Sequence, residues 1–86
     1  METVFVLSFH AMMDGDEYSK VEVFSTLEKA TARMILLYEE EVSVFEARFT
    51  EKEIVKRITR CHASVYEAYN YDKNHSVFDI TEQEVL

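Results

Sequence analysis

Alternating apolar and polar positions near the start of the chain predict a pair of strands. In the segment Thr3–Phe9, Phe5, Leu7 and Phe9 fall on one face of an extended chain. Lys20–Phe24 alternates in the same way, and the turn residues Asp14-Gly15-Asp16 lie between the two segments. The pattern therefore predicts a hairpin with a long acidic tip from His10 to Ser19.

A second hairpin is predicted near the end of the chain. Ser64–Tyr69 and Ser76–Thr81 alternate on either side of the turn residues 72–75. Residues 82–86 could add a short strand or turn. The alternation predicts one face directed toward helices, comprising Tyr66, Ala68, Phe78 and Ile80. It predicts a wetter opposite face with Val65, Glu67, Tyr69, Val77 and Asp79.

Between the hairpins the apolar spacing changes to three and four residues, which predicts a long helix. Ser25 and Glu28 have the spacing of a capping box, so the helix is expected to begin there. About six turns follow, with a buried stripe of Leu27, Ala30, Met34, Leu37, Tyr38, Val42, Phe45 and Phe49.

A second capping box, Thr50 to Glu53, predicts a bend near Phe49 and a new, shorter helix. Its apolar stripe would be Ile54, Val55, Ile58, Cys61 and His62. The alternative is one unbroken helix from Thr26 to Cys61, which at ~1.5 Å per residue would project beyond so small a domain. Two helices are the preferred interpretation.

These elements predict an α+β fold with two layers in the order β-β-α-α-β-β. The sheet is expected to be antiparallel, with two helices on one face. A chain of 86 residues has room for one hydrophobic core, so residues 1–86 are expected to form a single domain.

Composition removes several classes of protein. One glycine cannot build a glycine-rich phosphate loop, and one cysteine, Cys61, cannot form an internal disulfide, so a cytoplasmic protein is expected. No apolar run near the start is long enough for a secretion signal or a membrane span. His10, His62 and His75 match no metal-ligand spacing, and no nucleophile and base are fixed together. The expectation is a protein without metal, cofactor or catalytic residues.

Charge favours a cationic partner. Seventeen acidic residues face nine basic ones, giving a formal net charge of −8, which opposes direct binding to nucleic acid or to an anionic membrane. Glu39, Glu40 and Glu41 have no basic residue three or four positions away that could relieve their repulsion.

Two segments are therefore candidates for contact with a partner. The first is a carboxylate face formed by Glu39, Glu40, Glu41 and Glu46. The second is the predicted hairpin tip with Met12, Met13, Asp14, Asp16 and Glu17, where methionine side chains adapt to irregular surfaces. The carboxylates could serve only as a solvated, solubilising face. They could also occupy a site built for phosphates on a basic protein, which would be mimicry of nucleic acid.

The segment Val21–Ala30, after the opening strand, resembles small uncharacterised accessory proteins of phages and bacteria. The resemblance is in the strand-to-helix junction Val23-Phe24-Ser25-Thr26-Leu27-Glu28-Lys29-Ala30 and covers about the first forty residues. It implies an accessory protein that binds and blocks a host enzyme or defence nuclease, in the host cytoplasm if the protein is encoded by a phage. It identifies no functional residues.

The sequence thus predicts a small, acidic, non-enzymatic binding protein. Its expected partner is a basic protein surface, belonging to a nucleic-acid-binding protein or nuclease. The alternative is a structural or regulatory homodimer in which sheet faces or oppositely charged segments of two copies pair.

Overall fold

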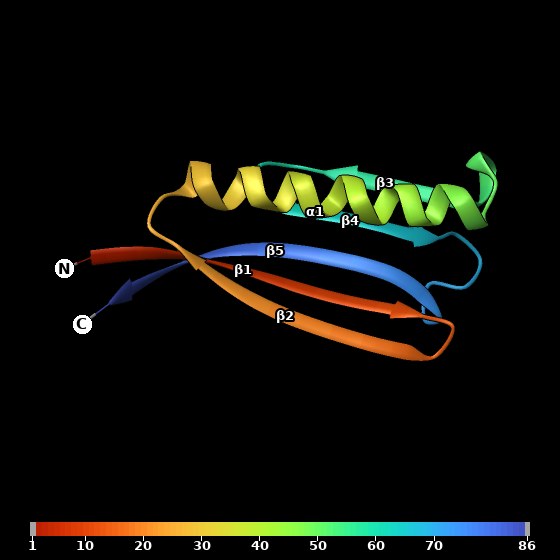
Figure 1. The fold of residues 1–86 in the computed structure, drawn as a ribbon, viewed down its shortest axis with the longest axis horizontal. Helices are drawn as coiled ribbons and strands as arrows, with labels where there is room; N and C mark the ends of the chain where they lie inside the picture. The colour runs from red at the N-terminus through yellow and green to blue at the C-terminus, as the bar shows by residue number, and fades with distance from the viewer. Residues whose placement is uncertain (1, 86) are drawn as a thin grey trace.

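One long helix lies against one face of a five-stranded antiparallel sheet (Figure 1). This computed structural model describes residues 2–85. The elements follow the order β1 (Glu2–Met13), β2 (Asp16–Phe24), α1 (Leu27–Arg48), a 3₁₀ turn (Glu51–Glu53), β3 (Ile54–Ile58), β4 (His62–Glu67) and β5 (Asn74–Val85). The strands lie in the spatial order β2-β1-β5-β4-β3, which makes β2 and β3 the edges of the sheet.

The predicted β-β-α-α-β-β arrangement with two helices is wrong. The segment after Phe49 forms strand β3 instead of a second helix, so the described residues contain five strands and one helix. Three of the five residues of β3 are β-branched, and Ile54, Lys56 and Ile58 alternate with Val55 and Arg57. β-Branched side chains lose rotamer freedom in a helix and pack well on a pleated sheet, which favours the strand.

The second capping box does form, but it ends in a single 3₁₀ turn. The backbone N–H and the hydroxyl of Thr50 both donate to Glu53 Oε1, at 2.9 and 2.8 Å. Phe49 and Ile54, on either side of this turn, have extended backbone angles. The capping box therefore reverses the chain from α1 into β3 without starting a new helix.

The first hairpin has a short turn and long strands, where the sequence predicted a long tip. Only Asp14 and Gly15 connect β1 to β2, with φ angles of 52° and 90°. Two positive φ values in a two-residue connection match the twist of the flanking strands and favour Asp-Gly. Met12 and Met13 therefore belong to β1 and not to a loop.

α1 begins one residue later than predicted and ends at the predicted bend. Thr26 is the N-cap, and its hydroxyl accepts a hydrogen bond of 3.2 Å from the Lys29 N–H. Phe49 is the C-cap. The predicted apolar stripe faces the sheet, because Ala30, Met34, Tyr38 and Phe45 are buried and its other four members pack against them.

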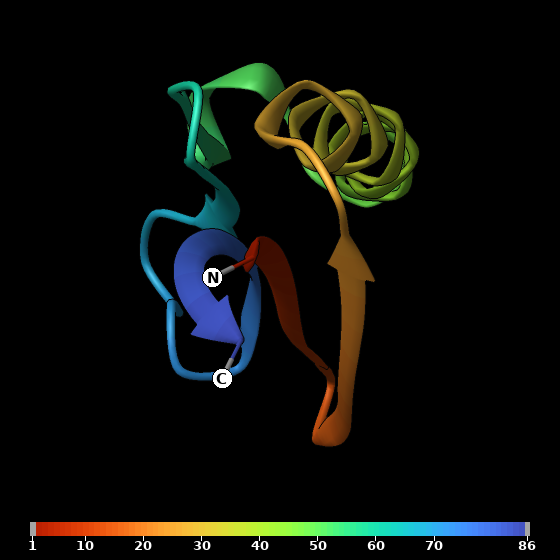
Figure 2. The same cartoon turned by 90° about the vertical axis from the view of Figure 1, so that its left-hand side faces the viewer.

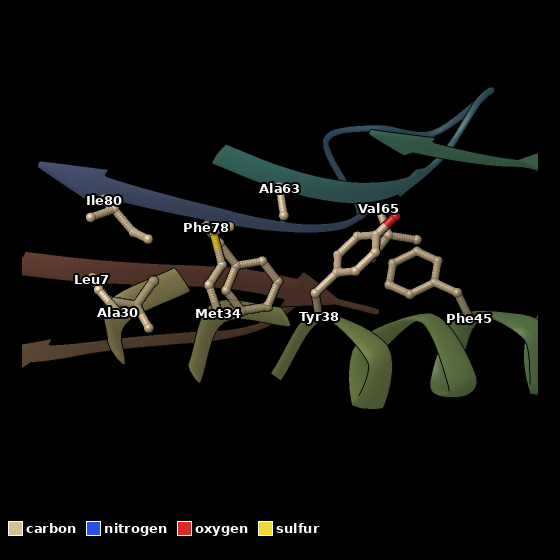
Figure 3. Close-up of a cluster of buried hydrophobic side chains, with 9 residues drawn as sticks. All are labelled: Leu7, Ala30, Met34, Tyr38, Phe45, Ala63, Val65, Phe78 and Ile80. Carbon is tan, nitrogen blue, oxygen red and sulfur yellow. The ribbon is translucent and has the colours of Figure 1, made fainter. Parts of the chain in front are cut away.

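The core lies between α1 and the central strands (Figure 3). Phe45 and Met34 reach from the helix toward Phe78 of β5 and Val65 of β4, and all four are fully buried. The predicted inward direction of Phe78 and Ile80 is confirmed. The complete cluster is Leu7, Ala30, Met34, Tyr38, Phe45, Ala63, Val65, Phe78 and Ile80.

The side chains of β4 point to the opposite faces of the sheet from those predicted. Ala63 and Val65 lie under the helix, whereas Tyr66 lies on the opposite face of the sheet together with Val77. Seen along the length of the molecule, α1 covers only one side of the sheet, with β3 beside it (Figure 2). No second layer covers the other face within residues 2–85.

Candidate partner-binding groove

A groove runs between the second half of α1 and the edge strand β3. Two adjoining hollows of about 480 and 390 Å³ form it, and both are lined by Glu46 and Lys56. Because β3 is the last strand of the sheet, no further strand of residues 2–85 closes the groove on that side. The groove is therefore open to a segment of another molecule.

The floor of the larger hollow is mainly apolar and continuous with the core, whereas the smaller hollow is mostly polar. Val42 and Ile58 line the larger hollow, and Phe49 and Ile54 line the smaller one. Val42, Phe49 and Ile54 also pack against the buried cluster, whereas Ile58 is 47% exposed. Covering this floor would remove apolar surface from water, which favours binding.

The aromatic ring of Tyr38 also lines the larger hollow and fixes it to the core. Tyr38 is buried and makes an edge-on contact with Phe78, with the ring centroids 6.3 Å apart. Burial raises the pKa of the Tyr38 hydroxyl, and this hydroxyl can donate a hydrogen bond to a ligand.

The walls of the groove carry carboxylates. Glu39 and Glu46 are seven residues apart, or two helical turns, and so project from the same side of α1 toward β3. Glu51 adds a third carboxylate at the smaller hollow. The single ion pair of Glu46 within residues 2–85 is with Lys56 Nζ, at 3.9 Å, and such exposed pairs contribute little. No lysine or arginine of that range pairs with Glu39 or Glu51.

The capping turn is what places β3 beside α1. Glu53 accepts from the Thr50 backbone N–H and hydroxyl, and these bonds lower the pKa of the Glu53 carboxyl, the backbone bond being the larger cause. The Ala68 N–H then donates to the Glu53 carbonyl at 2.7 Å, which joins the turn to the end of β4. The turn thus fixes the wall of the groove opposite the helix.

Four predicted residues of the carboxylate face do not form one face. Consecutive helical residues point about 100° apart, so Glu39 lines the groove and Glu40 is exposed on another side. Glu41 accepts a hydrogen bond of 2.8 Å from the buried Ser76 hydroxyl. Glu41 is therefore the hydrogen-bond acceptor for a buried hydroxyl of the sheet. Only Glu39 and Glu46 come together in the groove.

The predicted hairpin-tip residues lie at the far end of β1 and β2 and are also divided. Met13 packs against the core, whereas Met12, next to it in the strand, points to the other face of the sheet. Asp14 forms an ion pair with Arg48 at the end of α1. Asp16 and Glu17 are exposed, with Glu17 Oε1 3.8 Å from His10 Nδ1.

Sequence reasoning missed the wall of the groove that faces the helix. Ile54, Lys56 and Ile58 lie on its β3 wall, and Glu51 lies at the turn. They were assigned to a second helix, where they would have faced elsewhere. The alternation of residues 54–58, rich in β-branched side chains, was the available signal for a strand.

Comparison with protein-family models, curated proteins and solved structures finds no match to this chain. The resemblance to phage and bacterial accessory proteins therefore stays a prediction. Within residues 2–85, no three histidine, cysteine or acidic side chains are arranged to hold a metal ion. Helix α1, the one helix of that range, is too polar to cross a membrane.

Proposed function

We propose that this protein is a non-enzymatic binding protein that takes a basic segment of another protein into the α1–β3 groove. The observation that carries the proposal is the pairing of an apolar floor with carboxylates that have weak or no internal partners. Lysine and arginine combine an apolar stem with a cationic head. Their stems would cover Val42 and Ile58, and their heads would reach Glu39 and Glu46.

The net charge of −8 adds a longer-range contribution. It raises the rate at which a cationic partner meets the acidic surface, and salt would screen this effect. Lys56 already lies beside Glu46, so an incoming cation would compete only with a weak internal pair.

The narrower form of the proposal concerns the identity of the partner. A protein that binds nucleic acid presents spaced cationic side chains to phosphates, and carboxylates can occupy the same positions. We infer that the protein blocks such a partner, in the manner of a phage-type accessory inhibitor. Glu40, Asp16 and Glu17, which are exposed outside the groove, would extend the acidic surface.

The test uses a defined probe with a matched control. The probe is a synthetic helical peptide with leucines along one face and lysines flanking them, and the control peptide has glutamates in place of the lysines. Calorimetry should detect binding of the lysine peptide alone. Replacing both Glu39 and Glu46 by glutamine should weaken that binding at least about tenfold, which corresponds to about 1.4 kcal/mol.

The control variant removes the same charge elsewhere. Glu82 and Glu84 are exposed on β5, away from the groove, so changing both to glutamine should alter affinity less than about threefold at physiological salt. An equal loss in the two variants would mean that net charge and not the groove binds the peptide. Where a host partner is recovered by capture, competition with DNA tests the blocking activity separately.

One feature favours a homodimer as a second candidate function. Val21 and Val23 of the edge strand β2 are each 62% exposed, and an edge strand offers unpaired backbone groups to a second copy. Sedimentation velocity distinguishes this candidate. A tight dimer that dissociates in a Val21→Lys variant would support it, and a monomer at all concentrations would exclude it.

A further inference from the structure

The uncovered face of the sheet contains a second hollow, of about 470 Å³, that does not contribute to the groove. It is lined by Arg57, His62, Ser64, Tyr66, Tyr71 and Val77. Because Ala63, Val65 and Phe78 face α1, their strand neighbours in this hollow point the opposite way. Its volume falls within the range of small-molecule sites, about 300–1,000 Å³.

A cation and a hydroxyl lie side by side in this hollow. Arg57 of β3 is directly opposite Ser64 of β4, which in turn is opposite Val77 of β5. Arg57 is exposed and makes no ion pair with any carboxylate of residues 2–85. An unpaired guanidinium beside a hydroxyl is suited to bind phosphate, because its planar donors can bond two phosphate oxygens.

A histidine held by a carboxylate lies next to this pair. His62 Nδ1 is 2.6 Å from Asp79 Oδ1, and the two residues are directly opposite in the β4–β5 register. With Nδ1–H donating to Asp79, the ring orientation is fixed. His62 Nε2 has no hydrogen-bond partner within the described range and is available to a ligand.

The aromatic side of the hollow is fixed by contacts within the protein. Tyr66 and Tyr71 meet edge-on with centroids 4.9 Å apart, and Tyr71 stacks on His75 at 4.7 Å. His75 Nδ1 also donates to the Tyr71 carbonyl oxygen at 2.6 Å, which ties the β4–β5 connection to β5. The tyrosines therefore form a preformed wall for a flat organic group.

We propose that this hollow binds a small aromatic phosphomonoester of the nucleoside monophosphate type. The phosphate would be held by Arg57 and Ser64, His62 Nε2 would accept from a hydroxyl group of the ligand, and the base would lie against Tyr66 and Tyr71. The single glycine of the chain excludes a glycine-rich phosphate loop, but side chains supply the donors here. This site is independent of the α1–β3 groove, so either proposal can fail without the other.

Titration of the full chain followed by heteronuclear NMR tests the proposal. The probes are adenosine monophosphate, inorganic phosphate and adenosine. Adenosine monophosphate should shift the signals of His62, Ser64 and Tyr66 saturably, and should bind at least about tenfold tighter than either fragment. Arg57→Gln should weaken this binding at least about tenfold. Arg60→Gln, which removes an equal charge from the neighbouring β3–β4 turn, should change it less than about twofold.

Three outcomes would overturn the proposal. They are the absence of a saturable shift up to about 10 mM nucleotide, adenosine binding as tightly as its phosphate, and equal losses in the two arginine variants. Both variants change exposed residues, so both are expected to fold. Unchanged NMR signals from the buried residues of α1 would show that they do.

Discussion

At the scale of single residues, the surroundings of a carboxylate decide whether it serves the fold or remains available to a partner. Glu41 accepts from the buried Ser76 hydroxyl, and Asp14 pairs with Arg48, so both are committed to internal contacts. Glu39 has no such partner among the described residues and lines the groove. The three consecutive glutamates therefore have different surroundings, although they are adjacent in the sequence.

Glu22 should make stability depend on pH. Hydrogen bonds from Arg33 at 3.0 Å and from Lys20 at 2.7 Å lower the pKa of Glu22, with Arg33 the larger cause. A lowered pKa in the folded state means that the stabilisation is present above the unfolded-state pKa and is lost as the pH falls through the folded-state value. The stability difference between wild type and Glu22→Gln should therefore be present at neutral pH and shrink below about pH 4.

Urea denaturation at several pH values measures this difference. Glu84→Gln, which removes a carboxylate without a basic partner in the described range, is the control and should show a smaller pH-dependent difference. A Glu22→Gln difference that grows on acidification would contradict the assignment.

At the scale of elements, the two-residue turn between β1 and β2 depends on glycine. Gly15 has a φ of 90°, and a Cβ added there would meet no atom within 4 Å. The cost of Gly15→Ala is thus conformational, and we expect about 1 kcal/mol of lost stability. Gly15→Asn should lose less, because asparagine tolerates positive φ better. Thermal unfolding of both variants checks the order, and equal stability of wild type and Gly15→Ala would argue for a longer loop.

A matched pair of valines tests the register of β4. Both Val65 and Val77 were predicted on the wetter face, but Val65 is fully buried under α1 and Val77 lines the open-face hollow. Val65→Thr buries a hydroxyl in the core and should cost about 1–3 kcal/mol. Val77→Thr should stay within about 0.5 kcal/mol. Chemical denaturation gives both values, and the reverse order would restore the predicted register.

The elements that the sequence predicted well are those with long, consistent patterns. The eight-member stripe of α1 and the alternation of Phe5, Leu7 and Phe9 identified a helix and a strand correctly. Residues 54–58 were ambiguous because a short apolar segment behind a capping box fits either element. The β4 side chains were assigned to the wrong faces, because a shift of one residue along a strand exchanges the side chains on its two faces. Of the predicted site residues, Glu39 and Glu46 lie together in the groove. The opposite wall of the groove could not be predicted, because residues 54–58 were assigned to a helix and not to strand β3.

At the scale of the whole molecule, α1 covers one face of an elongated sheet and leaves two open surfaces. The molecule measures 46 × 21 × 16 Å, with the groove on the helix side and the open-face hollow on the other. The acidic walls belong to the first surface and the unpaired Arg57 to the second. The groove and the open-face hollow lie on opposite sides of the sheet, which allows two ligands to bind without overlap.

A basic segment of a partner is proposed to bind between α1 and β3. The most direct test is NMR mapping of the wild-type protein titrated with the lysine-flanked leucine peptide. We expect saturable shifts concentrated at Val42, Glu46, Lys56 and Ile58, with little change at Asp16 and Glu17 of the hairpin tip. Shifts spread evenly over all exposed carboxylates, or centred on the hairpin tip, would contradict it.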